Sequence, residues 1–145
     1  MPEVASAVSE GRAAFGTIDS WLIWNLSGGV NGGAHVTDVT NASRTMLMEL
    51  ATATWHGPTC QALGVPMDLL PTIKSCSEVY ATLACTALHG VPISGCAGDQ
   101  HAAMLGQICL TPGSAKSTYG TGCFMVSTFW TLLDSNPRPL PCVRP

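Results

Sequence analysis

The sequence predicts an α/β fold. Short apolar runs with strand composition alternate along the chain with segments that have helical spacing or helix-capping residues. Gly and Pro turns separate these elements, and the run from Val91 to Gly95 leads through a Gly turn directly into a helical segment. With 145 residues the chain is long enough to bury a core, and it corresponds to one domain or to parts of two.

The composition is poor in charge. Charged residues make up 10% of the chain, whereas ordinary globular domains have roughly 25%. Hydrophobic residues make up 46%. Because a free-standing domain needs a charged surface to stay soluble, we expect much of this surface to be covered by other parts of a larger protein. The chain is therefore a candidate fragment.

Charge and composition also exclude several functions. The net charge is −3 and no basic stripe occurs, so a nucleic-acid partner is not expected. No run approaches the ~18 apolar residues of a membrane span, and no secretory signal is recognisable, so we expect a cytoplasmic protein. The seven cysteines contain no C-x-x-C pair and the histidines have no partners at metal-ligand spacing, so neither a disulfide framework nor a metal site is predicted.

The first elements follow from local signals. Residues 1–12 are small and polar, and we expect them to be loose. Apolar residues at helical spacing predict a helix from Ile18 to Leu26, with Thr17 as its N-cap and Asp19 in its first turn. Residues 35–40 have the composition of a short extended segment.

The segment from Asn41 to Leu50 is predicted to be a capped turn that runs into a short helix. It contains Arg44, which is a candidate anion ligand. A structural role for Arg44, in which it bonds loop carbonyls or pairs with Asp38, is the commoner use of such a residue.

The middle of the chain continues the alternation. A short helix is expected from Pro58 to Leu63 because Gly64 follows it, and a strand is expected within residues 73–80. Residues 91–95 form a second strand candidate, and a helix begins near Asp99 and ends near Gly106.

A hairpin is predicted next. Residues 114–118 and 123–128 have strand composition, and Tyr119-Gly120-Thr121-Gly122 joins them as a tight turn. The two glycines permit a positive φ on either side of Thr121.

Two features of this region carry chemistry. Asp99 lies at a strand-to-helix corner, where α/β folds bind ligands, and its carboxylate can accept a proton from a substrate hydroxyl. Gln100 beside it can hydrogen-bond a polyol. The backbone N–H groups and hydroxyl of the Gly-Thr-Gly turn can hold a phosphate. Each feature also has a structural reading, since Asp99 can simply cap a helix, the turn can be an ordinary hairpin, and Phe124 can be a core residue.

Longer strings in the sequence resemble the glycerol kinases of the FGGY carbohydrate kinase family. The resemblance runs in order and nearly without gaps from about residue 12 to residue 128. Its most specific strings are Thr-Asn-Ala-Ser-Arg-Thr at residues 40–45 and Tyr-Gly-Thr-Gly-Cys-Phe at residues 119–124. Further matching strings lie at residues 15–24, 35–39, 77–80, 92–95 and 97–100.

The resemblance implies an incomplete part of an actin-like, ribonuclease H-like ATPase fold. It divides the chain into four parts: a loose segment at 1–14, the end of the family's first domain at 15–110, the start of its second domain at 111–128, and a Pro-rich tail outside the family pattern at 129–145. The implied reaction is transfer of the ATP γ-phosphoryl group to glycerol with Mg²⁺. The implied full-length enzyme is a homo-oligomer.

The resemblance also implies roles for five residues. Asp99 resembles the general base, which also binds glycerol, and Gln100 and Phe124 resemble glycerol contacts. Gly120 and Thr121 resemble contacts to the ATP phosphates. No metal ligand is carried over, because the family's Mg²⁺-organising aspartate, most of its glycerol pocket and its adenosine site have no counterpart in these residues.

We therefore expect a glycerol kinase fragment that is inactive alone. Two alternatives stay open at this point. One is a non-catalytic chain that associates with intact kinase subunits, and the other is a kinase of a different polyol or sugar.

Overall fold

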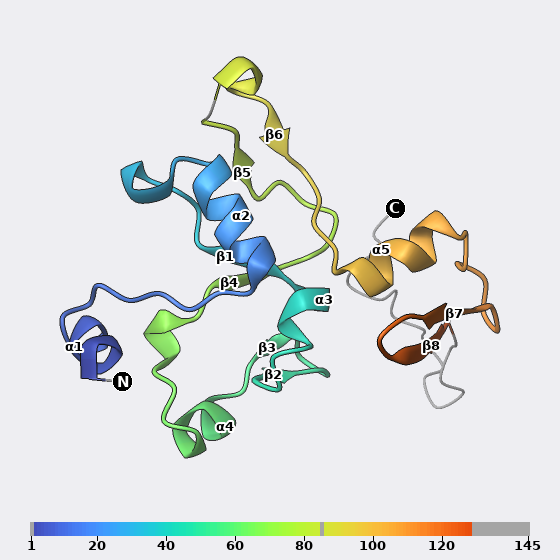
Figure 1. Ribbon diagram of the computed structural model, residues 1–145, viewed down its shortest axis with the longest axis horizontal. Helices are drawn as coiled ribbons and strands as arrows, with labels where there is room; N and C mark the ends of the chain where they lie inside the picture. The colour runs from blue at the N-terminus through green and yellow to red at the C-terminus, as the bar shows by residue number, and fades with distance from the viewer. Residues whose placement is uncertain (1, 85, 129–145) are drawn as a thin grey trace.

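The computed structural model describes residues 2–84 and 86–128. The predicted Pro-rich tail at residues 129–145 lies outside this range. Figure 1 shows that most of the elements gather in one body, from which helix α5 leads to a separate hairpin made of β7 and β8. Within the described ranges, no helix has the length and apolar character needed to cross a membrane.

The elements are short. The α-helices are α1 (Pro2–Ser9), α2 (Ile18–Leu26), α3 (Val39–Ala42), α4 (Gly57–Ala62) and α5 (Asp99–Gly106). Short 3₁₀ helices are η1 (Gly29–Asn31), η2 (Met67–Leu69) and η3 (Thr86–Leu88). The strands are β1 (Val36–Asp38), β2 (Met48–Glu49), β3 (Thr54–Trp55), β4 (Thr72–Lys74), β5 (Ala81–Thr82), β6 (Pro92–Ile93), β7 (Ala115–Tyr119) and β8 (Cys123–Ser127).

Strands β1 and β4 form a parallel pair at the centre of the body, with Val36 opposite Thr72 and Asp38 opposite Lys74. Parallel strands need a long crossover, and here it contains α3, the β2–β3 hairpin and α4. Helix α2 packs against β1 and buries Ile23 with Val36 and Tyr80. The predicted α/β class therefore rests on this pair.

A second small core lies within the crossover. Leu47, Cys60 and Leu70 are buried together, and Trp55 packs against them. The Trp55 Nε1–H donates to the Pro71 carbonyl at 2.7 Å, which satisfies the polar edge of the indole. This core holds α4 against the end of the β2–β3 hairpin.

The carboxylate of Asp38 is fully buried at the end of β1. It caps α3 by accepting from the Thr40 N–H at 2.7 Å and from the Asn41 N–H at 3.3 Å. It also accepts from the Asn41 side-chain amide at 2.5 Å, from the Thr40 hydroxyl, and from the Cys76 thiol at 3.3 Å. These donors compensate the desolvation of a charge that would otherwise be costly to bury.

The Thr40 hydroxyl extends this network to α5. Its Oγ1 donates to Asp38 and accepts from the Gly98 N–H at 2.7 Å, a contact between residues 58 apart in the chain. Gly98 is the N-cap of α5. The buried carboxylate at the end of β1 therefore fixes the point at which α5 begins.

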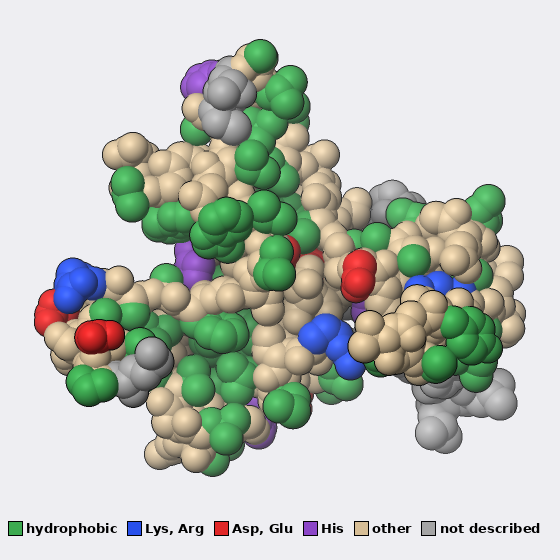
Figure 2. Space-filling model, in the orientation of Figure 1, with side chains coloured by type: hydrophobic (Ala, Val, Ile, Leu, Met, Phe, Trp, Pro, Cys, Tyr) green, Lys and Arg blue, Asp and Glu red, His purple; other side chains and the backbone are tan. Residues whose placement is uncertain are grey.

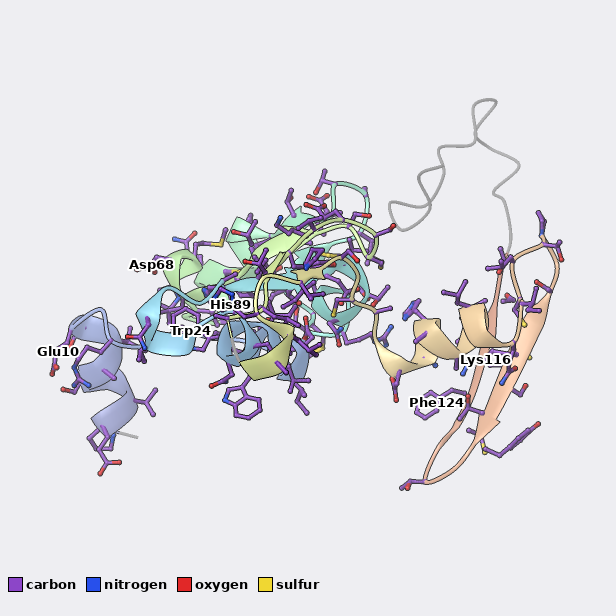
Figure 3. The ribbon with its side chains drawn as sticks, turned by 90° about the horizontal axis from the view of Figure 1, so that it is seen from above. Glu10, Trp24, Asp68, His89, Lys116 and Phe124 are labelled. Atoms are coloured by element: carbon purple, nitrogen blue, oxygen red, sulfur yellow. The ribbon has the colours of Figure 1, made fainter. Side chains whose placement is uncertain are left out.

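The β7–β8 hairpin is antiparallel, and its register places Lys116 opposite Val126 and Thr118 opposite Phe124. Its base is closed by the Thr128 hydroxyl, which donates to the Cys109 carbonyl at 2.8 Å after α5. Figure 3 shows the hairpin standing beyond α5, at the opposite end of the molecule from α1.

Several predicted elements are observed. Helix α2 has the predicted bounds with Thr17 at its N-cap, α4 ends just before Gly64, and α5 spans Asp99–Gly106. The hairpin also forms. Its two glycines permit a positive φ, but neither adopts one, and the positive φ values among the described glycines lie elsewhere. A Cβ at Gly122 would lie 2.7 Å from the exposed Phe124 ring, so a larger residue there would require the ring to move.

Other expectations differ from the structure. Residues 1–12 were expected to be loose, but they contain α1, where Pro2 suits the first helical position and Glu3 the first turn. The predicted strand within 73–80 stops at Lys74, because the Ser75 N–H turns to the Glu78 carboxylate at 2.9 Å. Helix α5 forms where it was predicted, but it buries none of its residues.

The segment from Asn41 to Leu50 was also predicted incorrectly. Its helix, α3, begins earlier, at Val39, because Asp38 and not Asn41 provides the cap. The chain does not continue as a helix, since Met46 adopts a φ of 64° and residues 48–49 form β2.

The Asp38 network predicts a large stability effect. Asp38→Ala removes a helix cap and leaves buried N–H groups without an acceptor, so we expect the free energy of unfolding to fall by about 2–4 kcal/mol. Urea unfolding followed by tryptophan fluorescence measures this change. Asp68→Ala is the matched control, since Asp68 is exposed and its loss should change stability by less than about 0.5 kcal/mol. Equal unfolding midpoints for the two variants would contradict this role of Asp38.

Candidate functional site

A cavity of about 1040 Å³ lies where the main body, α5 and the hairpin meet. The body contributes Thr40, Asn41 and Arg44 to its wall, and α5 contributes residues 99–101. The β7–β8 hairpin closes the other side with residues of both strands. The cavity therefore joins the two parts of the sequence for which chemistry was predicted.

Asp99 lies in the first turn of α5 and lines this cavity. The N-cap position belongs to Gly98, so Asp99 is not the capping residue. Its carboxylate accepts from the Gln100 N–H at 2.7 Å, and the positive end of the helix dipole favours its charge. In the described ranges no Lys or Arg forms an ion pair with Asp99. The carboxylate is therefore available to a ligand.

Four of the five predicted site residues line the same cavity. They are Asp99, Gln100, Gly120 and Phe124. Thr121 lies at the tip of the hairpin and is not part of the wall. Phe124 is 57% exposed, which excludes the alternative that it is a core residue of the described chain.

Lys116 is a feature that the sequence reasoning missed. It lines the cavity from β7, yet only 4% of it is exposed. Its Nζ donates to the Thr118 hydroxyl at 2.6 Å. The signal that could have found it is the strand period of two, which places Lys116 on the same face of β7 as Thr118.

Arg44 and His101 complete the polar wall. Arg44 was considered either an anion ligand or a partner of Asp38, and the described residues contain no ion pair between Arg44 and Asp38. Burial lowers the pKa of His101 below its usual value of 6.5, and the positive charges of Arg44 and Lys116 lower it further against the opposing effect of Asp38 and Asp99. His101 is therefore neutral at pH 7.

The chemistry of the wall suits phosphate better than a metal ion. Arg44 and Lys116 supply charge and N–H donors for phosphate oxygens. Asp99 is the single carboxylate among the described wall residues, and two cations share the wall with it. Mg²⁺ prefers oxygen ligands and is held by one or two carboxylates together with phosphates and water. These residues therefore do not form a dedicated Mg²⁺ site.

Comparison with known proteins identifies the family. Residues 1–106 match the N-terminal domain of the FGGY family of carbohydrate kinases. The chain belongs to the FGGY family. The resemblance seen in the sequence is thus confirmed.

Among relatives of this FGGY chain, the glycerol kinase of Arabidopsis thaliana is 58% identical over 126 residues, which cover 86% of this chain and 24% of the relative. The crystal structure of Plasmodium falciparum glycerol kinase with ADP matches with a TM-score of 0.77 and 40% identity, over 86% of this chain and 24% of that one. A ligand-bound xylulose kinase from Lactobacillus acidophilus matches in fold, with a TM-score of 0.63 at 23% identity, over 74% of this chain and 22% of that one.

These matches establish the fold. The FGGY chain has part of an actin-like ATPase fold, as the resemblance implied. It spans about a quarter of the length of the curated relatives that it matches. The cavity lies where the family match ends, because α5 closes at Gly106 and the hairpin follows.

The electrostatics of the wall predict the titration of His101. We expect its imidazole to titrate below pH 6.5, and Arg44→Gln should raise its pKa because a nearby positive charge is removed. The pKa of His101 is lower in the folded chain than its usual value of 6.5 in the unfolded chain, so the unfolded chain binds the proton more readily. The neutral imidazole therefore contributes to the stability of the fold above pH 6.5. This contribution is lost as the pH falls below 6.5 and through the folded-state pKa.

Proton NMR of the imidazole measures both effects. Arg12→Gln is the control, because Arg12 lies beyond α1 and pairs with Glu10 at 2.6 Å. A His101 pKa that is unchanged by Arg44→Gln would show that the guanidinium does not act on this ring.

Proposed function

We propose that this chain carries the glycerol-facing part of an ATP-dependent glycerol kinase. The observation that supports this most directly is the single cavity that contains both Asp99 and the β7–β8 hairpin. The identity of 58% to a glycerol kinase supports the choice of glycerol over other sugars. In this proposal the product is glycerol 3-phosphate.

Asp99 is the proposed general base. It would accept the proton of the attacking glycerol hydroxyl, which requires a carboxylate that is accessible and not neutralised by an ion pair. Asp99 meets both conditions among the described residues, since it is exposed in the cavity and its carboxylate accepts a hydrogen bond from the adjacent Gln100 N–H. The backbone directly before Asp99 is held in place by the hydrogen bond that the Gly98 N–H donates to the Thr40 hydroxyl.

The remaining proposed contacts follow from the same wall. Gln100 would hydrogen-bond a glycerol hydroxyl, and the Phe124 ring would pack against the carbon chain. Gly120 and Thr121 would bind ATP phosphates through backbone N–H groups and the hydroxyl. Because phosphoryl transfer depends mainly on positioning and electrostatic stabilisation, these contacts would supply alignment more than bond chemistry.

The proposal includes the wider arrangement expected from the sequence. Residues 15–110 would end the first domain of the kinase and residues 111–128 would begin the second, so that the cavity lies between domains. The full enzyme would be a cytoplasmic homo-oligomer that uses ATP with Mg²⁺.

A hybrid enzyme tests the proposed function. Residues 15–128 of this chain would replace the matching segment of the Arabidopsis thaliana glycerol kinase, and ADP release would be followed with glycerol or xylulose. We expect turnover with glycerol, and we expect Asp99→Asn in the hybrid to lower kcat by about 10³-fold or more, since an amide cannot act as the base.

The control variant is Asp68→Asn, which changes an exposed carboxylate away from the cavity and should leave kcat unchanged. A folded hybrid that prefers xylulose would contradict glycerol as the substrate. Full activity of the Asp99→Asn hybrid would contradict the role of Asp99 as base. The 145-residue chain assayed by itself is expected to release no ADP above background.

A second candidate function rests on the exposed face of α2. On this helix Ile18 is 78% exposed and Trp21 is 65% exposed in the described structure. Figure 2 shows hydrophobic side chains gathered over this part of the body. Such a face fits a non-catalytic chain that associates with intact kinase subunits.

Light scattering after size-exclusion chromatography tests this second function. The chain would be mixed with the Arabidopsis thaliana glycerol kinase, and a stable complex is expected only if association is its role. Trp21→Glu should then abolish the complex, while Glu3→Gln on α1 should not. Clean monomeric behaviour of the chain in the mixture would count against association.

A further inference from the structure

Two basic side chains face the cavity without a carboxylate partner. Lys116 reaches it from β7 and Arg44 reaches it from the turn after α3. Neither forms an ion pair with any described residue, whereas Lys74 and Arg12 each pair with a glutamate. The described wall therefore carries two cations and one carboxylate, that of Asp99, and neither cation pairs with it.

The burial of Lys116 is the less usual of the two observations. Lysine is almost never buried unless it is paired, because the ammonium loses its hydration. Lys116 is only 4% exposed, and a single hydrogen bond to the Thr118 hydroxyl is described for its three N–H donors. An anion bound in the cavity would supply the missing acceptors.

The backbone of Arg44 is held by a hydrogen bond, but its side chain forms no ion pair with any described residue. Its N–H donates to the Asn41 carbonyl at 3.0 Å, in the turn that follows the α3 cap. The Asp38 oxygens are occupied by Thr40 and Asn41 and do not bind the guanidinium. A free guanidinium presents paired N–H donors that match two oxygens of a phosphate.

The two cations act on the same region of the cavity. Both lower the pKa of His101, which lies between the body and the hairpin on α5. Figure 2 shows basic groups on either side of an acidic group where α5 joins the body. A negatively charged group at this place would be attracted by both cations.

The hairpin register places Lys116 beside the proposed glycerol contact. The Lys116 ammonium bonds Thr118, and Thr118 is the cross-strand partner of Phe124. Figure 3 shows Lys116 and Phe124 on the hairpin, near its junction with α5. A phosphate held by Lys116 would therefore lie close to the polyol and away from the hairpin tip at Thr121.

We propose that Lys116 and Arg44 together bind a phosphate group in this cavity, either the phosphate of a monoester product or a terminal phosphate of a nucleotide. This inference rests on the proposed function, because it assigns two further substrate-binding residues to the same site. It gives the cavity a phosphate position next to Asp99 and distinct from the Gly-Thr-Gly tip.

Titration of the chain with three probes tests the inference. Inorganic phosphate, glycerol 3-phosphate and ADP would each be added, with binding followed by calorimetry and by the His101 imidazole signal. We expect binding to raise the pKa of His101, since negative charge beside it favours its protonation. Lys116→Gln and Arg44→Gln should each weaken phosphate binding by about tenfold or more, as expected for a lost charge-assisted hydrogen bond.

Lys74→Gln is the matched control, because Lys74 lies on β4 and pairs with Glu78 at 3.1 Å. If Lys116→Gln and Arg44→Gln weaken the affinity for glycerol 3-phosphate more than the affinity for ADP, the site binds the phosphate of the product. If they weaken the affinity for ADP more, the site binds a phosphate of the nucleotide. Phosphate binding that is equal in the parent chain and in both variants would overturn the inference. So would the absence of phosphate binding by the parent chain.

Folding and function can be separated in the same series. Arg44 is exposed, so Arg44→Gln decides the question even if Lys116→Gln does not fold, and Lys116→Arg should restore binding by restoring the charge. If the variants lose phosphate while the hybrid enzyme fails to phosphorylate glycerol, the inference holds and the proposed kinase function fails. If the hybrid is active and the variants bind phosphate normally, the kinase function holds and the inference fails.

Discussion

The buried carboxylate of Asp38 is the constraint on which the rest of the structure depends. It ends β1, caps α3 and, through the Thr40 hydroxyl, holds the N-cap of α5. One group thus connects the central strand pair to the helix that carries Asp99. The described residues contain two small apolar cores. The polar network around Asp38 therefore fixes the relative positions of β1, α3 and α5, which a large apolar core would fix in many other proteins.

The cavity is a consequence of that connection. Its walls come from segments more than fifty residues apart, and the hydrogen bond between Gly98 and Thr40 joins two of them. The body supplies Arg44, α5 supplies Asp99 and the hairpin supplies Lys116, so each element contributes one charged group. A substrate bound between them would contact all three elements at once, which is the arrangement expected of a site that closes around its ligand.

Local signals predicted the elements whose causes are local. These signals are the helical spacing of apolar residues in α2, the glycine after α4 and the Gly turn before α5, and they were sufficient to predict the three helices. The sequence strings around Asp99 and Gly120 identified two sides of the cavity. The capping role of Asp38 could not be read in this way, because Asn41 offers an equally good cap in the sequence. The burial of Lys116 depends on the three-dimensional arrangement around the hairpin, which no local pattern encodes. The roles of all five site residues, Asp99, Gln100, Gly120, Thr121 and Phe124, stay predictions.

The thiol of Cys96 lies on the edge of the same network, 3.7 Å from an Asp38 oxygen. Burial raises its pKa to about 12, and the charge of Asp38 adds to the effect. At neutral pH the thiol form therefore dominates over the thiolate that oxidants and alkylating agents attack. Burial and the carboxylate that orders the fold therefore both disfavour the reactive thiolate of Cys96, so we expect this sulfur to react slowly with oxidants.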